Sequence, residues 1–160
     1  MLDKITPPQL SFTDYPPVAF HFQVVFMTAG VVPNMLDVRF QKVSGLSSEV
    51  TTETVDEGGQ NLYTHKLPNK ISYGNLTLER GMVIGSPLGL EFNAAMSMFR
   101  FYPSNVIVML LNEESLPVAS WLFFKAYPVK WSVSDLDANS NQIVIETMEL
   151  AYTRFQRLTL

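Results

Sequence analysis

Acidic and amide side chains between residues 135 and 146 have the spacing of a calcium-binding loop. The candidate ligands at loop positions 1, 3, 5, 7 and 12 are Asp135, Asp137, Asn139, Asn141 and Glu146. Position 6 is Ser140, where the sharp turn of an EF-hand requires glycine. The flanking residues alternate as in strands and do not repeat at the helical period. A polar turn between two strands is therefore favoured over a calcium site.

The other titratable side chains do not form a pattern typical of catalysis. The two histidines, His21 and His65, have no His or Cys at ligand spacing. The chain has no cysteine, which excludes thiolate nucleophiles, disulfides and cysteine-based metal sites. The sequence contains no GxSxG, Walker A or dinucleotide-binding motif. Glu113-Glu114 is typical of an exposed pair at a hairpin tip. We therefore expect no enzyme activity, no catalytic residue, no metal and no cofactor.

Composition favours a protein that hides part of its surface in an assembly. Charged residues make up 16% of the 160 residues, below the usual level of about 25%. A dense monomeric core would give the same composition, so both readings stay open. The net charge of −4 and the absence of Lys/Arg runs argue against phosphate binding. We expect synthesis in the cytoplasm without a signal peptide, and no membrane anchor.

The elements that would position these residues are mostly strands. We expect one domain over 1–160, opening with an extended, proline-rich leader at 1–19. Ser86-Pro87 predicts the start of one α-helix over about 87–99, because serine caps helices and proline suits their first turn. Strands are expected over 20–26, 36–41, 71–80, 106–111, 118–126, from 126 onward, and 142–154. In the last, the apolar phase slips near Glu146-Thr147, which predicts a bulge or a strand that faces the core at one end and a neighbour at the other. The fold class is mainly β: an antiparallel β-sandwich or barrel with one helix.

Residues 48–68 predict an extended β-arm. Residues 48–57 are rich in Thr and Val, which suit strands, yet both faces of that strand are polar. Gly58-Gly59 supplies a turn that tolerates positive φ, and Pro68-Asn69 is expected to close the second limb. A lone two-stranded ribbon is marginal in water, and its open edges invite pairing. A surface hairpin and an arm that docks on a neighbouring subunit are the two interpretations.

Four motifs in order carry a resemblance to a known family: V-S-G-L-S-x-E-V (43–50), E-G-G-x-N (57–61), H-K-L-P-x-K (65–70) and Y-x-N-L-T-L-x-R-G (73–81). The sequence resembles the tail tube family of contractile phages, which includes inner tube proteins of phage-derived contractile injection systems. W-x-F-x-x-A-Y-P-V-K-W (121–131) and N-x-I-V-I-E-T-M-E-L-A (141–151) extend the resemblance to roughly residues 15–152. The helix start L-G-L-E-F-N and the long leader depart from the family pattern.

The resemblance implies a structural subunit that forms stacked hexameric rings around a channel for DNA or effector proteins. It implies as partners further copies of the chain, a contractile sheath, baseplate or spike proteins, a terminator, and cargo bound without sequence specificity. It also implies assembly into a phage tail or an injection apparatus, with release outside the cell as one outcome. A tube-initiating or terminal ring protein and a small-ligand-binding β-barrel are the alternatives. The acidic net charge predicts a neutral to acidic channel. Contacts between subunits are predicted at Ser44, Gly45, Leu46, Glu49, Glu57, Gly58, Gly59, Asn61, His65, Lys66, Pro68, Lys70, Arg80 and Lys130.

Overall fold

The computed structural model describes residues 22–27, 40–139 and 141–158. Its strands are β1 (Phe22–Met27), β2 (Lys42–Ser44), β3 (Ser48–Val55), β4 (His65–Tyr73), β5 (Leu76–Gly81), β6 (Ser104–Leu111), β7 (Pro117–Val133), β8 (Ile145–Ala151) and β9 (Arg154–Leu158), and its helix is α1 (Pro87–Met98). The mainly β class with one helix is confirmed. The leader at 1–19, His21 and most of the strand expected over 36–41 lie outside the described residues.

A seven-stranded sheet forms the body, with the strand order β1-β6-β7-β8-β5-β2 and β9 also paired to β7. β7 is long enough to belong to two layers, because residues 117–126 pair with β6 and residues 127–133 pair with β8. The chain turns between them at Lys125, whose φ is +53°. The backbone N–H of Lys125 donates to Asn105 Oδ1 at 3.1 Å. One bent strand thus replaces the two that the sequence predicts.

The core lies between these two layers. Val106, Val108 and Phe123 face inward from one layer. Leu78, Met148 and Leu150 face them from the other, as alternate residues of β5 and β8. Helix α1 adds Leu88 and Phe92 to the same cluster. All core pairings are antiparallel, as the sequence predicts.

Helix α1 begins and ends where its capping residues dictate. The Ser86 hydroxyl accepts a hydrogen bond from the Gly89 backbone N–H at 3.1 Å, which satisfies one of the free donors of the first turn. Pro87 follows in the first turn. Phe99 ends the helix in the left-handed region, with φ 52° and ψ 39°. The prediction of one helix over about 87–99 is confirmed. Among the described residues, no helix has the length and apolar character needed to cross a membrane.

Two strands predicted as continuous are interrupted. The strand expected over 71–80 divides at Gly74-Asn75, so β4 belongs to the arm and β5 to the body. The strand expected over 142–154 becomes β8 and β9, separated at Tyr152-Thr153. The predicted bulge at Glu146-Thr147 is wrong, because β8 pairs with β5 in unbroken register. The alternation of inward and outward residues is continuous along β8, because Glu146 occupies a core position ahead of Met148 and Leu150.

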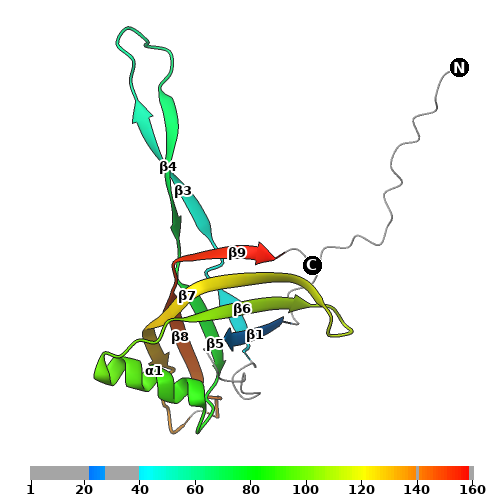
Figure 1. The fold of residues 1–160 in the computed structure, drawn as a ribbon. Coiled ribbons are helices and arrows are strands. Elements are labelled where there is room, and N and C mark those ends of the chain that lie inside the picture. Colours follow the sequence, from blue (N-terminus) through cyan, green and yellow to red (C-terminus); the bar gives the residue numbers. More distant parts are fainter. Residues whose placement is uncertain (1–21, 28–39, 140, 159–160) are drawn as a thin grey trace, which may run out of the picture.

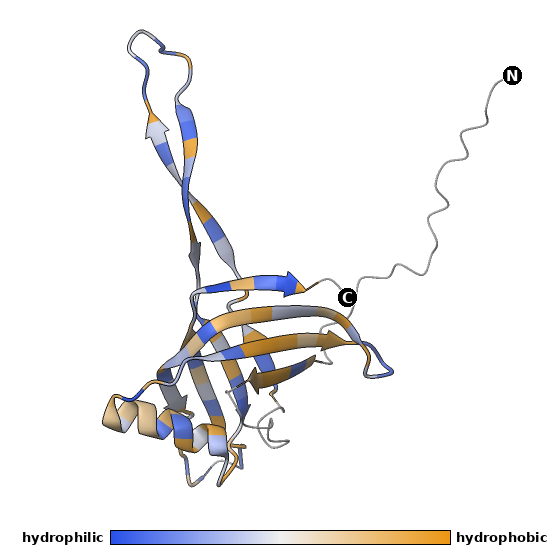
Figure 2. Ribbon diagram, viewed as in Figure 1, coloured by the Kyte–Doolittle hydropathy of each residue, from blue (hydrophilic) through white to orange (hydrophobic). Residues whose placement is uncertain are grey.

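The arm and the helix lie at opposite ends of the molecule. In Figure 1, β3 and β4 project from one end of the body, and α1 lies across the other. Figure 2 shows hydrophobic colour along β1, β6 and β7, whereas the arm alternates between hydrophilic and hydrophobic residues. This polarity gives the subunit two distinct ends with which to meet other molecules.

Candidate assembly surfaces

The arm is a separate two-stranded sheet. Among the described strands, β3 and β4 pair only with each other. β3 and β4 pair antiparallel, from Ser48 opposite Tyr73 to Val55 opposite His65. The register shifts by one residue between Val50 and Thr52. There the Thr51 hydroxyl donates to the carbonyl of Lys70 at 3.0 Å and accepts from its backbone N–H at 3.3 Å. The predicted β-arm is thus confirmed as a hairpin.

Pro68 does not close the second limb as predicted, because β4 continues to Tyr73. Pro68 lies opposite Thr52, directly beside the register shift. Proline cannot donate a hydrogen bond to the ladder and is tolerated at edges and bulges. The local bulge allows the proline to remain inside a strand that has no third neighbour.

The tip of the arm is a loop over residues 56–64. Gly58 and Gly59 form its turn, with the Gln60 backbone N–H donating to the Glu57 carbonyl at 3.1 Å. Gly59 has φ +93°, a conformation that other residues rarely adopt, so the predicted need for glycine is confirmed at this position. His65 Nε2 lies 3.8 Å from Glu57 Oε1, an exposed pair that contributes at most about 1 kcal/mol.

Two glycines and an aromatic cluster fix the base of the arm to the body. A Cβ at Gly45, which has φ +86°, would collide with the backbone oxygen of Asn75. A Cβ at Gly74 would lie 2.9 Å from the hydroxyl of Ser47. The two strands of the arm therefore cross closely where they enter the body, and only glycine permits this approach.

The aromatic cluster begins at the last residue of β4. The ring of Tyr73 lies 5.9 Å from that of Tyr152 and 5.6 Å from that of Phe155, and Phe123 lies 4.9 Å from Tyr152. Such edge and tilted contacts add to the apolar burial. Burial raises the pKa of the Tyr152 hydroxyl, and the neighbouring Tyr73 raises it further. The cluster anchors the base of the arm to the body through Tyr73.

The arm carries more exposed apolar side chains than we expect from the polar residues that dominate 48–57. They are Val50, Val55, Leu62, Tyr63, Leu67 and Ile71. Val50 and Ile71 lie directly opposite each other and form an apolar pair on one face. Leu62, at the tip, is 91% exposed. These groups would leave water only by contact with another molecule.

A second exposed apolar surface surrounds α1. We call it the helix-end patch; it consists of Met82, Ile84, Leu90, Met96, Met98, Phe99 and Tyr102. Ile84 is 94% exposed and Phe99 84% exposed. Between residues 82 and 102 the only charged residues are Glu91 and Arg100. Loss of charge, with aromatic and methionine side chains, is typical of the centre of a protein interface.

Arg80 is the one predicted contact residue that the structure places inside the subunit, and it is withdrawn from that set. Its side chain is 1% exposed, and its Nε donates to Glu146 Oε2 at 3.0 Å. Arg80 Nη2 donates to the Ser86 hydroxyl at 2.8 Å, and Trp131 Nε1 donates to Glu146 Oε1 at 2.6 Å. This network joins β5, β7 and β8 to the capping residue of α1.

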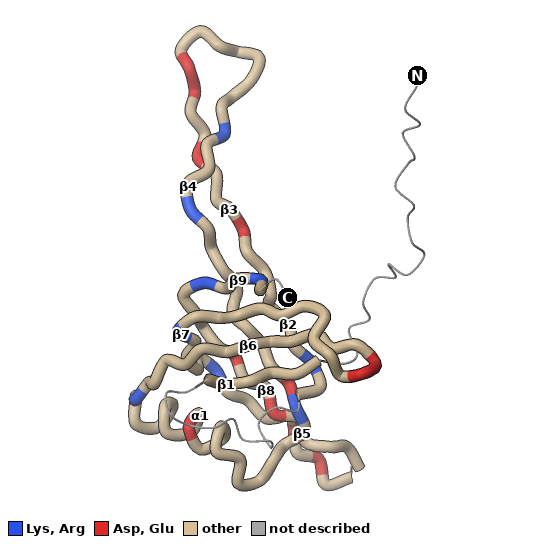
Figure 3. The backbone as a smooth tube through the Cα atoms, turned by 45° about the vertical axis from the view of Figure 1, so that its right-hand side comes forward, with Lys and Arg blue, Asp and Glu red and all other residues tan. Residues whose placement is uncertain are grey.

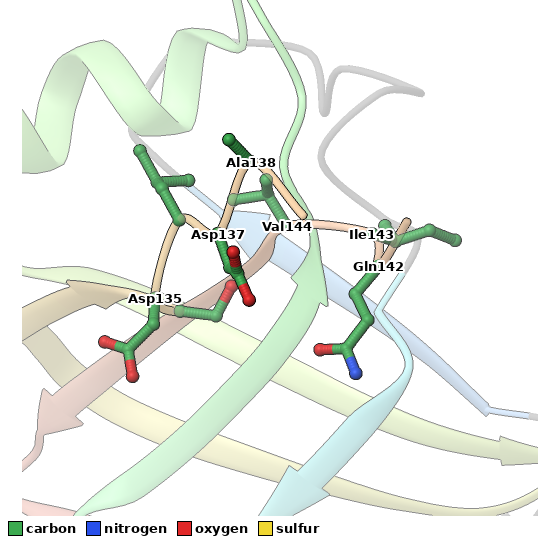
Figure 4. Close-up of a pocket in the computed structure, with 8 residues that line it drawn as sticks. Asp135, Asp137, Ala138, Gln142, Ile143 and Val144 are labelled. Carbon is green, nitrogen blue, oxygen red and sulfur yellow. The ribbon is translucent and has the colours of Figure 1, made fainter. Parts of the chain in front are cut away.

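The same network argues against a calcium site over residues 135–146. The carboxylate of Glu146 is buried in the core, where its oxygens accept from Arg80 and Trp131. Asp137 Oδ1 instead accepts from the Asn139 backbone N–H at 2.9 Å, which is a local turn. Figure 4 shows that the side chains of Asp135, Asp137 and Gln142 do not converge on one point. Among the described residues, no group of three or more His, Cys, Asp or Glu side chains could hold a metal.

The remaining predicted contact residues lie on accessible parts of the subunit. Ser44, Gly45 and Leu46 are half-buried at the base of the arm, and Lys130 is exposed on β7 beside Glu149. Exposed arm positions are Glu49, Glu57, Gly58, Gly59, Asn61, His65, Lys66, Pro68 and Lys70. Contact of these residues with another copy remains a prediction. The helix-end patch was missed, although the run of Met and Phe on an otherwise uncharged helix could have indicated it.

A β-sandwich with a projecting hairpin and two apolar ends defines a subunit built to assemble. The sequence agrees with one family model over residues 18–156, described as T4-like virus tail tube protein gp19. The chain therefore belongs to this tail tube family. No curated protein matches its sequence.

Solved structures give the same family and fold. A chain in the anti-feeding prophage baseplate, six-fold symmetrised, is 40% identical, with a TM-score of 0.84 and coverage of 90% of this chain and 96% of that one. A chain of the anti-feeding prophage tube-terminating cap is 25% identical, with a TM-score of 0.80 over 98% and 99% of the two chains. The sheath–tube complex of an extracellular contractile injection system has a chain of the same fold, with 21% identity, a TM-score of 0.78 and coverage of 92% and 95%.

Proposed function

We propose that this chain is an inner tube subunit of a contractile phage tail or contractile injection system. Its copies form hexameric rings that stack head to tail around a central channel. Six-fold symmetry is the symmetry of the baseplate structure that holds the 40%-identical chain. The proposal treats residues 1–160 as one tube-protein domain, of which the family model matches 18–156.

The observation that carries this proposal is the placement of two exposed apolar surfaces at opposite ends of one subunit. The arm bears one and the helix-end patch bears the other (Figure 1). Two different surfaces that meet between copies make a heterologous contact, and such contacts generate open stacks unless rotation closes them. We infer that the arm of one copy meets the helix end of a copy in the next ring.

Charge supports the same arrangement. From Ser48 to Tyr73 the arm carries four acidic and two basic residues, and its acidic groups appear red in Figure 3. The helix end offers Arg100 beside Phe99, the most exposed aromatic of the patch. The helix end carries one acidic and one basic residue, Glu91 and Arg100, so it opposes the acidic arm with no net negative charge. Exposed ion pairs would add little, so apolar contact and backbone pairing dominate.

The role that follows is mechanical, and we propose no catalysis. The expected partners are a contractile sheath, baseplate or spike proteins and a terminator, with DNA or an effector protein as passing cargo. The chain would be made in the cytoplasm without a signal peptide and assembled into the tail or injection apparatus. A second candidate is a tube-initiating or terminal ring, since the 40%-identical relative belongs to a baseplate structure and another relative to a cap.

The proposal is tested by weakening each end separately. Leu62→Ser removes an exposed side chain at the arm tip, and Phe99→Asn removes the most exposed aromatic side chain at the helix end. Asn tolerates the left-handed conformation of position 99, so the cap remains intact. We expect both variants to melt like the wild type and to lose most long assemblies in sedimentation. Leu116→Ser, at an exposed hairpin away from both ends, is the matched control. Tubes of normal length from both variants would overturn the proposal.

A further inference from the structure

Exposed methionine side chains gather at one end of the molecule. Among the described residues four methionines are exposed, and three of them belong to the helix-end patch: Met98 at 67%, Met82 at 50% and Met96 at 42%. The fourth, Met27, is the last residue of β1. Met148, by contrast, is fully buried in the core. A reagent dissolved in water can therefore reach the methionines of the helix-end patch without any opening of the fold.

The backbone at these three positions is held by regular structure. Met82 directly follows β5, and its backbone N–H donates to the carbonyl of Val144 at 2.9 Å. Met96 and Met98 lie in the last turn of α1. Figure 1 shows the end of β5 and α1 at the end of the molecule opposite the arm. A chemical change confined to these side chains would therefore alter the patch and leave the fold in place.

The sulfur of methionine has a defined oxidation chemistry. The chain contains no cysteine, so thioethers are its only sulfur groups. Hydrogen peroxide transfers one oxygen atom to a thioether: the O–O bond breaks, an S=O bond forms, the sulfur is oxidised by two electrons, and water is released. The product, methionine sulfoxide, is polar, and sulfoxide reductases convert it back to methionine.

A sulfoxide oxygen would find few partners in this patch. Of the seven patch residues, Tyr102 alone has a side chain that can donate a hydrogen bond, and Arg100 lies at the edge. If another copy covered the patch, the new oxygens would leave water largely unpaired, and burial of an unpaired polar group opposes contact. In a dissociated subunit the same oxygens stay hydrated.

We propose that Met82, Met96 and Met98 are oxidation sites that control assembly, because subunits with sulfoxide at the helix end stay out of the tube until they are reduced. This inference rests on the proposed function, in which the helix end meets the arm of another copy. That contact would also cover the three side chains in a finished tube. Peroxide would therefore act on unassembled subunits and spare assembled ones.

The test treats dissociated subunits with hydrogen peroxide and then allows them to assemble. Peptide mass mapping should show an added oxygen on each of the three methionines and none on Met148. The treated subunits should melt like untreated ones, yet the yield of sedimenting tubes should fall by about tenfold or more. Incubation with methionine sulfoxide reductases and a dithiol should restore the yield. An unchanged yield from subunits oxidised at all three positions would overturn the inference.

Two variants locate the effect. Met82→Leu/Met96→Leu/Met98→Leu keeps the apolar surface and removes its sulfur, so peroxide should leave its tube yield unchanged. Met27→Leu/Met109→Leu changes two methionines outside the patch and is the matched control, which should lose its tubes after peroxide as the wild type does. The opposite response of either variant would assign the effect to other residues and overturn the inference.

A second measurement needs no oxidant. Met98→Gln places an amide oxygen on the patch, as a sulfoxide would, and should lower the tube yield of untreated subunits, whereas Met98→Leu should not. Equal yields from these two variants would count against the inference even if the triple variant did not assemble. Absence of tubes from the untreated wild type would instead be a failure of the proposed function.

Discussion

At the scale of single residues, Glu146 explains why β8 has its observed register. It occupies a core position because Arg80 and Trp131 supply hydrogen bonds to both of its oxygens. A buried ion pair is weak evidence for stability as a whole, yet removal of one member leaves an uncompensated charge. The pair thus links β5 and β8, and through Ser86 the start of α1, only while both members are present.

Replacement of Glu146 by alanine should therefore lower the free energy of unfolding by about 3–5 kcal/mol, as for other broken buried pairs. The double variant Arg80→Met/Glu146→Leu should recover most of that loss, because no charge remains buried. Denaturant unfolding measures both. If the single variant unfolds at the wild-type midpoint, the network has no stabilising role.

Tyr152 has a buried hydroxyl without a hydrogen-bond partner among the described residues. An unpaired buried hydroxyl costs about 1–3 kcal/mol, so Tyr152→Phe should raise stability by up to that amount. Burial raises the pKa of Tyr152 above its ordinary value of 10.0. The folded chain therefore holds this proton longer than the unfolded chain, and stability should fall as the pH rises above about 10.

Thermal melts of the wild type and Tyr152→Phe across that range give the comparison. The wild type should lose stability more steeply than the variant, because only the wild type must ionise this hydroxyl. Parallel pH dependence of the two melts would contradict the assigned burial. Phe123, whose ring contacts Tyr152, should remain packed in both proteins.

At the scale of elements, the strand pairing of the arm is separate from the strand pairing of the body. β3 and β4 form their own sheet, and Val50 and Ile71 lie opposite each other near its base. Replacing residues 51–70 by an Asn-Gly turn should therefore leave the body folded, since this dipeptide suits a two-residue hairpin. We expect a melting temperature close to that of the wild type and no stacking of rings in micrographs.

Two results would contradict this expectation in different ways. Normal tubes from the shortened chain would remove the arm from the account of assembly. Loss of the melting transition would instead show that folding of the body depends on residues 51–70, because the shortened chain keeps Tyr73 and its contacts with Tyr152 and Phe155.

The sequence predicts the elements whose signals are local. Ser86-Pro87 predicts the start of α1, and Gly58-Gly59 predicts the turn at the arm tip. The strand predicted over 71–80 overlooks the division at Gly74-Asn75, although both residue types are depleted in strands and could have indicated it. At this point Gly45 and Ser47 approach closely from the connection between β2 and β3. Similarly, Glu146 reads as a polar residue out of phase until Arg80, 66 residues away in the sequence, is seen beside it.

At the scale of the whole molecule, assembly explains the low charge content. Exposed apolar residues gather on the arm and around α1, at opposite ends of the molecule. A monomer would leave these apolar ends in water, where large patches are uncommon. Stacked copies would cover both ends.

The most direct test of this account is electron microscopy of the purified full-length chain at increasing concentration, paired with a mass measurement in solution. The account predicts rings with six-fold end views and an open centre, and head-to-tail stacks of them as concentration rises. Small single particles and a strictly monomeric mass at high concentration, even with the sheath and baseplate partners present, would contradict it.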